Sequence, residues 1–111
     1  MKEKNPLLLS IIEGIQEKKG KNILTIKLKG ISGAICDYFV ICEGNSPTQV
    51  SALAESVEEV VQKKVNESPI RVQGLDYGDV IVHIFLPELR SFYNIDLLWE
   101  DAVLERVPSV E

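Results

Sequence analysis

The sequence is poor in the side chains from which most catalytic and metal sites are built. Among its 111 residues there is one histidine, and aromatic residues make up only 6%. A structural zinc site uses about four Cys, His or carboxylate ligands at characteristic spacings, and His83 has no such companions near it in the sequence. A general base would need a nucleophile within reach, and none can be identified. We therefore predict no metal, no cofactor and no catalytic residue, and we interpret His83 as structural or as part of a binding face.

Cysteine is also scarce, because the chain holds only Cys36 and Cys42. Two cysteines do not make a disulfide framework. On one strand, residues six apart would lie roughly 20 Å from each other, well beyond the reach of a disulfide. The sequence therefore predicts two buried, reduced thiols and a reducing compartment.

Long apolar runs are missing as well. No segment approaches the ~20 apolar residues that span a bilayer. The apolar patch near the N-terminus is interrupted by Ser10 and Glu13, and no small-residue cleavage site follows it. We expect a cytoplasmic protein that does not enter a membrane.

The chain has no surplus of basic residues over its larger part. Net charge is −5, and it is unevenly distributed: residues 1–36 carry seven Lys or Arg and three acids, while residues 37–111 carry five and fourteen. DNA is a poor partner for the larger part, because phosphate binding needs a concentrated basic patch. A basic protein is a better candidate partner, although acidity can also serve solubility alone.

What the sequence does contain is clear helical and strand periodicity. Asn5 and Pro6 begin a first helix, with an apolar stripe and with Gly20 as its left-handed end. Ser46, Pro47 and Gln49 form a capping box that begins a second helix, which runs to Val65. The stripes that these two helices should bury are Leu8, Ile11, Ile12 and Ile15, and Val50, Leu53, Ala54, Val57, Val60 and Val61.

Three long strands and two short ones are predicted between and after these helices. Residues 22–29 alternate, with Leu24, Ile26 and Leu28 facing inward, which indicates a half-exposed strand. Residues 37–43 are apolar on both faces and should be central in the sheet. Residues 70–72 and 103–107 predict short strands, residues 80–85 a long one, and residues 88–93 and 95–101 helical segments. The order predicts an α/β (α+β) fold, with a mixed β-sheet packed by helices, in one domain over residues 1–111.

One local pattern leaves an enzymatic alternative open. Gly44, Asn45 and Ser46 precede a helix, where free amides can bind phosphate, although the sequence has neither of the common glycine-rich phosphate motifs. A nucleotide-handling enzyme would add paired carboxylates for a metal, and Asp76 and Asp79 are the nearby candidates. The alternative function is therefore a residual nucleotide-binding enzyme, beside the simpler interpretation of a structural helix cap.

The segment 75–101 concentrates the residues that interfaces favour. A tight turn at residues 76–79 leads into the strand 80–85, and Arg90, Phe92, Tyr93 and Trp99 follow closely. Aromatic and arginine side chains are enriched in interface hot spots. Some of these rings should be core anchors, but they are too many for all of them to be buried in a domain of this size. We interpret the segment as a surface that another macromolecule binds.

At this point the sequence resembles a known family, the ribosomal silencing factors, also called the Iojap-like family. The resemblance covers nearly the whole chain. It is carried by the string DYFVIC at 37–42, by GNS at 44–46 with QV at 49–50, by LDYGDVIVHIF at 75–85, and by Arg90 with FY at 92–93 and LLW at 97–99.

The resemblance implies a translation repressor with a nucleotidyltransferase-like fold that lacks the catalytic apparatus. Such proteins bind ribosomal protein fourteen of the large ribosomal subunit and sterically block joining of the small subunit when nutrients are scarce. Homodimers are common, and organellar relatives suggest a role in large-subunit assembly. The predicted partner-binding residues are Asp76, Tyr77, Asp79, His83, Arg90, Phe92, Tyr93, Leu97 and Trp99.

The chain departs from the family pattern at one junction. Family members usually carry a short stretch with a tryptophan between the glycine that matches Gly74 and the leucine that matches Leu75. Here these two residues are adjacent. With this stretch absent, the strand that enters Leu75 is shorter than in the family, and part of the expected partner-binding surface is missing.

Overall fold

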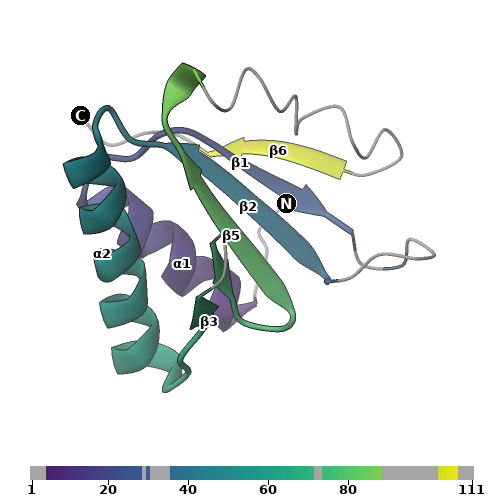
Figure 1. Cartoon of the computed structure of the whole chain (residues 1–111). Helices are drawn as coiled ribbons and strands as arrows, with labels where there is room; N and C mark the ends of the chain where they lie inside the picture. The colour runs from purple at the N-terminus through teal and green to yellow at the C-terminus, as the bar shows by residue number, and fades with distance from the viewer. Residues whose placement is uncertain (1–4, 29, 31–35, 72–73, 89–102, 108–111) are drawn as a thin grey trace.

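A six-stranded sheet with two helices on one of its faces makes up the computed structural model, which describes residues 5–28, 30, 36–71, 74–88 and 103–107 (Figure 1). The strand order is β3-β4-β5-β2-β1-β6. The elements are α1 (Pro6–Glu17), β1 (Lys21–Lys27), β2 (Tyr38–Glu43), α2 (Pro47–Val65), β3 (Ile70–Arg71), β4 (Leu75–Asp76), β5 (Val80–Phe85) and β6 (Val103–Val107).

The sheet is mixed, as the sequence predicts. β2 and β5 are parallel, in a register that runs from Tyr38 opposite Val80 to Glu43 opposite Phe85. The four other pairings are antiparallel. The predicted α+β class, the central position of β2 and the short strand β6 at one edge are all confirmed. The helix α2 follows β2 and returns the chain toward β5, which is how a parallel pair is connected.

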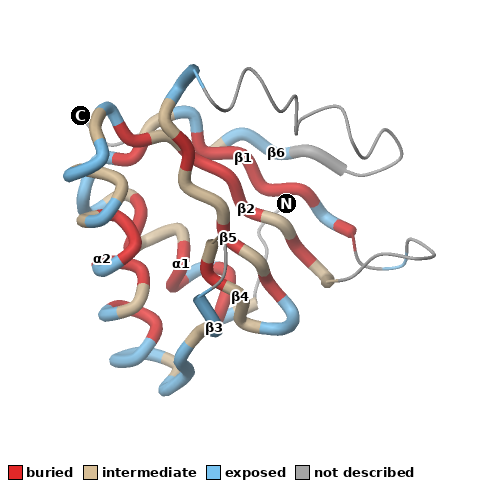
Figure 2. Tube along the Cα trace, viewed as in Figure 1, coloured by how far each residue is buried: buried red, intermediate tan, exposed pale blue. Residues whose placement is uncertain are grey.

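The main core lies between the sheet and the two helices. It contains most residues of the two predicted helix stripes, together with alternate residues of β2 and β5, among them Val40, Cys42, Val80 and Val82. Val50, which was predicted in the second stripe, is only partly buried and lies outside this core. A second buried cluster lies on the other face of the sheet and consists of Leu24, Ile26, Leu28, Ile41 and Phe85. Figure 2 shows buried residues along the central strands and along the sides of α1 and α2 that face the sheet.

The prediction of a half-exposed first strand is wrong. β1 lies between β2 and β6, and its burial is continuous from Ile23 to Ile26. Thr25, expected on the wet side, is only 7% exposed, and its hydroxyl donates to the Glu105 carbonyl at 3.3 Å. The alternation of β1 separates two buried faces instead of a wet and a dry one, because Ile23 belongs to the main core and Leu24 to the second cluster.

The first helix begins as predicted but ends differently. The Asn5 side chain accepts hydrogen bonds from the amides of Leu7 and Leu8. At the other end Lys19, not Gly20, has the left-handed conformation, with φ of 59°. A glycine is needed at position 20 for space, because a Cβ there would lie 2.5 Å from Cγ2 of Ile15.

The second helix has the predicted cap with one change in its partners. Ser46 Oγ accepts from the Gln49 amide at 3.2 Å. The Gln49 side chain accepts from the amide of Asn45 rather than from that of the capping residue, and its Nε2 donates to the Lys18 carbonyl at 3.2 Å. Gln49 therefore joins the beginning of α2 to the end of α1.

The helices also meet closely at a glycine. A Cβ on Gly14 would lie 2.7 Å from the Cα of Val57, so the two backbones approach closely there. The Ser56 hydroxyl donates to the Gly14 carbonyl at 2.8 Å.

The remaining expectations concern shorter segments and the cysteines. β4 was not predicted as a separate strand, because it has only two residues and merges with the turn that follows. Neither Cys36 nor Cys42 forms a disulfide, as predicted, although Cys36 is only partly buried. The predicted helical segments 88–93 and 95–101 lie outside the described residues, apart from Glu88. Among the described residues, no helix is long and apolar enough to cross a membrane.

Candidate functional site

The turn between β4 and β5 is held in a defined shape and presents exposed residues. The Gly78 amide donates to Asp76 Oδ1 at 2.8 Å, and the Tyr77 amide donates to the Val80 carbonyl at 3.0 Å. Gly78 has φ of +88°, a conformation that favours glycine. Gly78 and Asp79 are exposed. The turn therefore holds the Asp79 carboxylate in solvent on a backbone that is already ordered.

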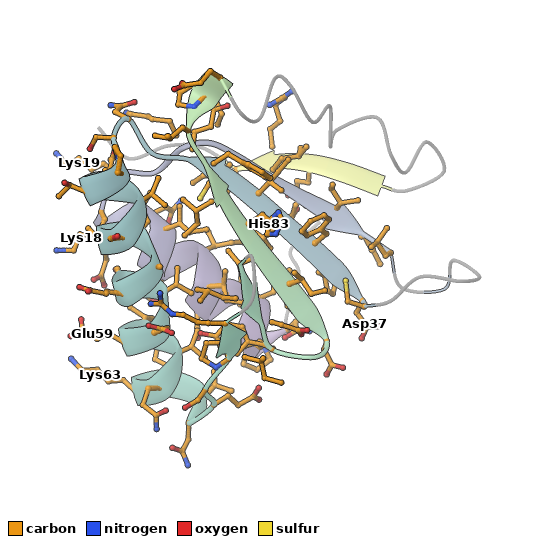
Figure 3. All side chains as sticks on the ribbon, viewed as in Figure 1. Lys18, Lys19, Asp37, Glu59, Lys63 and His83 are labelled. Carbon is orange, nitrogen blue, oxygen red and sulfur yellow. The ribbon has the colours of Figure 1, made fainter. Side chains whose placement is uncertain are left out.

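The beginning of β2 is bound to this turn. The Asp79 carbonyl accepts from the amides of Asp37 and Tyr38, at 2.8 and 3.1 Å. Figure 3 shows Asp37 at the end of β2 that lies beside the turn. We call Asp37, Asp76 and Asp79 together the acidic tip. Burial is the main cause that raises the pKa of the partly buried Cys36 thiol, and the negative charges of Asp37 and Asp76 add to it.

Asp37 is a member of this site that sequence reasoning missed. It stands some 40 residues before the turn in the sequence, and nothing local to it indicates function. The signal that could have found it is topological, because parallel strands place their beginnings at the same end of a sheet. Once β2 and β5 are paired in parallel, Asp37 and Asp79 must be neighbours.

Tyr77 does not belong to the exposed surface in the way that its position in the turn suggests. Its ring packs against the main core on the side of the helices. Its hydroxyl is buried and has no hydrogen-bond partner among the described residues. Burial, followed by the charges of Glu58 and Glu67, raises the pKa of Tyr77 to about 12. The phenol therefore stays neutral at every physiological pH.

His83 lies on the opposite face of the sheet, away from α1 and α2 (Figure 3). Its ring makes edge contacts with Phe39, at a centroid distance of 5.5 Å, and with Phe85, at 5.0 Å. Its Nδ1 is buried without a hydrogen-bond partner among the described residues. Burial lowers the pKa of His83. This neutral ring in an aromatic setting suits packing or apolar contact better than acid–base chemistry.

The predicted binding residues are therefore distributed over three places. Asp76 and Asp79 lie together at the acidic tip, Tyr77 packs toward the helices, and His83 faces the other way. Five predicted residues lie outside the described part of the chain: Arg90, Phe92, Tyr93, Leu97 and Trp99.

The geometry of the described residues argues against the nucleotide-binding alternative. Two of the amides that precede α2 are already used: that of Gly44 donates to the Phe85 carbonyl, and that of Asn45 to the Gln49 side chain. The acidic tip lies at the start of β2, whereas Gly44 follows its end, so six strand residues, or roughly 20 Å, separate the two. Within the described ranges, no group of three or more His, Cys, Asp or Glu residues could hold a metal ion.

Comparison with known proteins agrees with the fold and decides the family. The family model described as "Ribosomal silencing factor during starvation" matches residues 1–111, the whole chain. This chain is a member of the ribosomal silencing factor family. A ribosomal silencing factor of Halalkalibacterium halodurans is 37% identical over 113 residues, which span 95% of this chain and 91% of the relative.

The chain is also similar to a protein of known crystal structure and to a relative with a mitochondrial name. A crystal structure of a Chromobacterium violaceum protein superposes with a TM-score of 0.78 at 28% identity, covering 98% of this chain and 92% of that one. A more distant mouse relative, named for mitochondrial assembly of the large ribosomal subunit, is 29% identical and aligns with 57% of this chain and 32% of its own length. The family resemblance seen in the sequence is thus confirmed.

Proposed function

We propose that this ribosomal silencing factor represses translation by binding the large ribosomal subunit through its ribosomal protein fourteen and blocking the small subunit sterically. The observation that carries the proposal is the match of the family model to the whole chain, residues 1–111. On this proposal the protein acts in the cytoplasm and under nutrient limitation. This mechanism requires only that the bound protein occupies space at the subunit interface, and it needs no chemical reaction.

The acidic tip supports a basic protein as the partner. Asp79 and Gly78 are exposed on a turn whose backbone is fixed by hydrogen bonds, so little conformational entropy is lost when a partner orders them. Asp37 and Asp76 add negative charge at the same end of the sheet. Such a concentration of one sign of charge steers a partner of opposite charge and speeds association. The larger acidic part of the chain, residues 37–111, points in the same direction.

The direct test is a subunit-joining experiment. Purified large subunits are incubated with the protein, small subunits are added, and the joined ribosome is followed by light scattering or sedimentation. We expect joining to fall as the protein saturates the large subunits, and protein and large subunits to sediment together. Undisturbed joining at saturating protein, with binding demonstrated, would contradict the blocking mechanism.

The role of the acidic tip is tested separately by charge reversal. Asp79→Lys should slow association with the large subunit by roughly three- to tenfold at low salt, and the difference should shrink as salt screens the charges. The matched control is Glu17→Lys, which makes the same charge change at an exposed position at the end of α1. Equal association rates for the two variants would show that the acidic tip is not part of the docking surface.

A role in assembly of the large subunit is a second candidate, because the name of the mouse relative records such a role for that protein. It predicts that cells lacking this protein accumulate immature large subunits during growth, whereas the blocking mechanism predicts excess joined ribosomes in starvation. We also propose a homodimer, from the family resemblance. Analytical ultracentrifugation over a concentration series tests it, and a monomer throughout the series would exclude it.

A further inference from the structure

Two hollows lie beside α2, and we call the two together the groove: one is lined also by residues of β3, β4 and β5, and the other by the loop that follows the helix. The first half of the groove is a cavity of about 190 Å³. The walls of this cavity are mostly apolar and come from α2, β4 and β5, and Arg71 and Gly74 complete them. The apolar residues are Val50, Ala54, Leu75, Val82 and Ile84.

The second half of the groove is acidic. It is an open hollow of about 480 Å³ beside the C-terminal half of α2 and the loop that follows, and its charged residues are Glu55, Glu58, Glu59 and Glu67. Arg71 donates from Nε and Nη2 to both oxygens of Glu58, at 2.9 and 2.7 Å. Arg71 lines the apolar half and Glu58 the acidic half, so this ion pair stands at the boundary between the two.

We propose that this groove binds a short basic segment of a partner protein, with one aliphatic side chain in the apolar cavity and Lys or Arg side chains over the acidic hollow. Four carboxylates face one guanidinium along the groove, which leaves an excess of negative charge. The arrangement complements a cationic segment and repels nucleic acid, whose phosphates would meet these carboxylates.

The size of the apolar cavity, taken by itself, suits one protein side chain. Sites for small molecules commonly have volumes of about 300–1,000 Å³, and the apolar cavity is smaller. A partner segment of alternating basic and aliphatic character would use both halves at once, because the Arg71–Glu58 ion pair contributes one residue to the lining of each and so makes them neighbours. Glu58 and Glu67 also help to raise the pKa of Tyr77, so the negative potential extends to the neighbouring core.

This interaction is distinct from ribosome docking as proposed above. The groove is formed by α2, β3, β4 and β5 residues that face the helices, whereas the acidic tip lies at the end of the sheet. Sequence reasoning alone would assign the acids of α2 to a solvated helix face. What that reasoning could not see is the apolar cavity beside them, which exists only when β4 and β5 are packed against Val50 and Ala54.

The test uses the full chain and a fluorescent peptide, Lys-Lys-Leu-Lys-Lys amide, in an anisotropy titration at low salt. We expect saturable binding that weakens roughly tenfold when serine replaces the leucine of the peptide, since the apolar contact is then lost. Because this change is made in the peptide, it cannot unfold the protein. Equal affinity of the two peptides would show that the cavity takes no side chain and would overturn the proposal.

The acidic half is tested with Glu55→Lys/Glu59→Lys, a double change at two exposed positions. The control is Glu17→Lys/Glu105→Lys, which makes the same change in net charge at exposed positions elsewhere. We expect the first variant to lose at least tenfold in peptide affinity and the control to lose little. Equal losses would mean attraction by net charge alone, and chemical-shift changes away from α2, β3 and β4 would place the peptide at another surface. Either result would refute the proposal that the groove binds a basic segment.

Discussion

The two glycines on either side of β4 should respond differently to substitution, because they are glycines for different reasons. Gly74 needs space: an added Cβ would lie well within contact distance of the Val82 carbonyl oxygen and of the His83 ring. Gly78 needs its backbone angle: φ is +88°, and an added Cβ would meet nothing within 4 Å.

The costs can be worked from these contacts. In Gly74→Ala the obstacle is partly backbone, which no rotamer change can relieve, so β4 must move away from β5. Overpacking costs about 1–3 kcal/mol, and each ladder hydrogen bond weakened by the shift adds about 1 kcal/mol. We expect a loss of about 2–4 kcal/mol. Gly78→Ala should cost about 1–2 kcal/mol, the penalty for an ordinary residue in a left-handed conformation.

Asparagine separates the two causes, because it enters the left-handed region more readily than alanine but is larger. Gly78→Asn should therefore be more stable than Gly78→Ala, while Gly74→Asn should be at least as unstable as Gly74→Ala. Urea unfolding followed by far-UV circular dichroism measures all four free energies of unfolding. If asparagine relieved both sites, or neither, the assignment of steric and conformational causes would be wrong. Gly74→Ala should also weaken binding to large subunits, since it displaces the turn that carries the acidic tip.

Three further predictions concern single side chains. Because burial lowers the pKa of His83 in the folded state, the neutral ring contributes stability above its unfolded pKa of about 6.5. That stability should be lost as pH falls through the unfolded and then the folded pKa. In His83→Phe the free energy of unfolding should therefore depend less on pH between pH 7 and 5 than in the unchanged protein. The same slope in both proteins would contradict this. Tyr77→Phe removes a buried hydroxyl without a described partner, so it should be neutral or stabilising by up to about 1 kcal/mol. Ultraviolet titration should show that the variant lacks the phenol with a pKa of about 12. Ser46→Ala should cost about 1 kcal/mol and Ser46→Asp nearly nothing, since only the first removes the oxygen that caps α2; equal thermal unfolding midpoints for the two would refute the capping role.

Much of the architecture was available from local chemistry in the sequence. The caps at Asn5 and Ser46 accept hydrogen bonds from the first amides of their own helices. Because the partners are only two or three positions apart, the sequence alone predicts such contacts. Apolar residues on both faces of residues 38–42 required a central strand, because such a strand is stable only when covered on both sides. The motifs at 37–42 and 75–85 were long enough to indicate the family, which the whole-chain match confirms.

The tertiary structure decided what depends on neighbours distant in sequence. Periodicity showed that β1 alternates but not that both of its faces are buried, because that follows from its place between β2 and β6. The turn at 76–79 suggested that Tyr77, Asp79 and His83 act together. Tyr77, however, lies in the turn and packs against the main core, whereas His83 follows the core residue Val82 in β5 and so points to the opposite face of the sheet. Asp37 joined Asp79 only through the parallel pairing of β2 with β5. The acids of α2 became one side of a groove only when β4 and β5 placed an apolar cavity beside them.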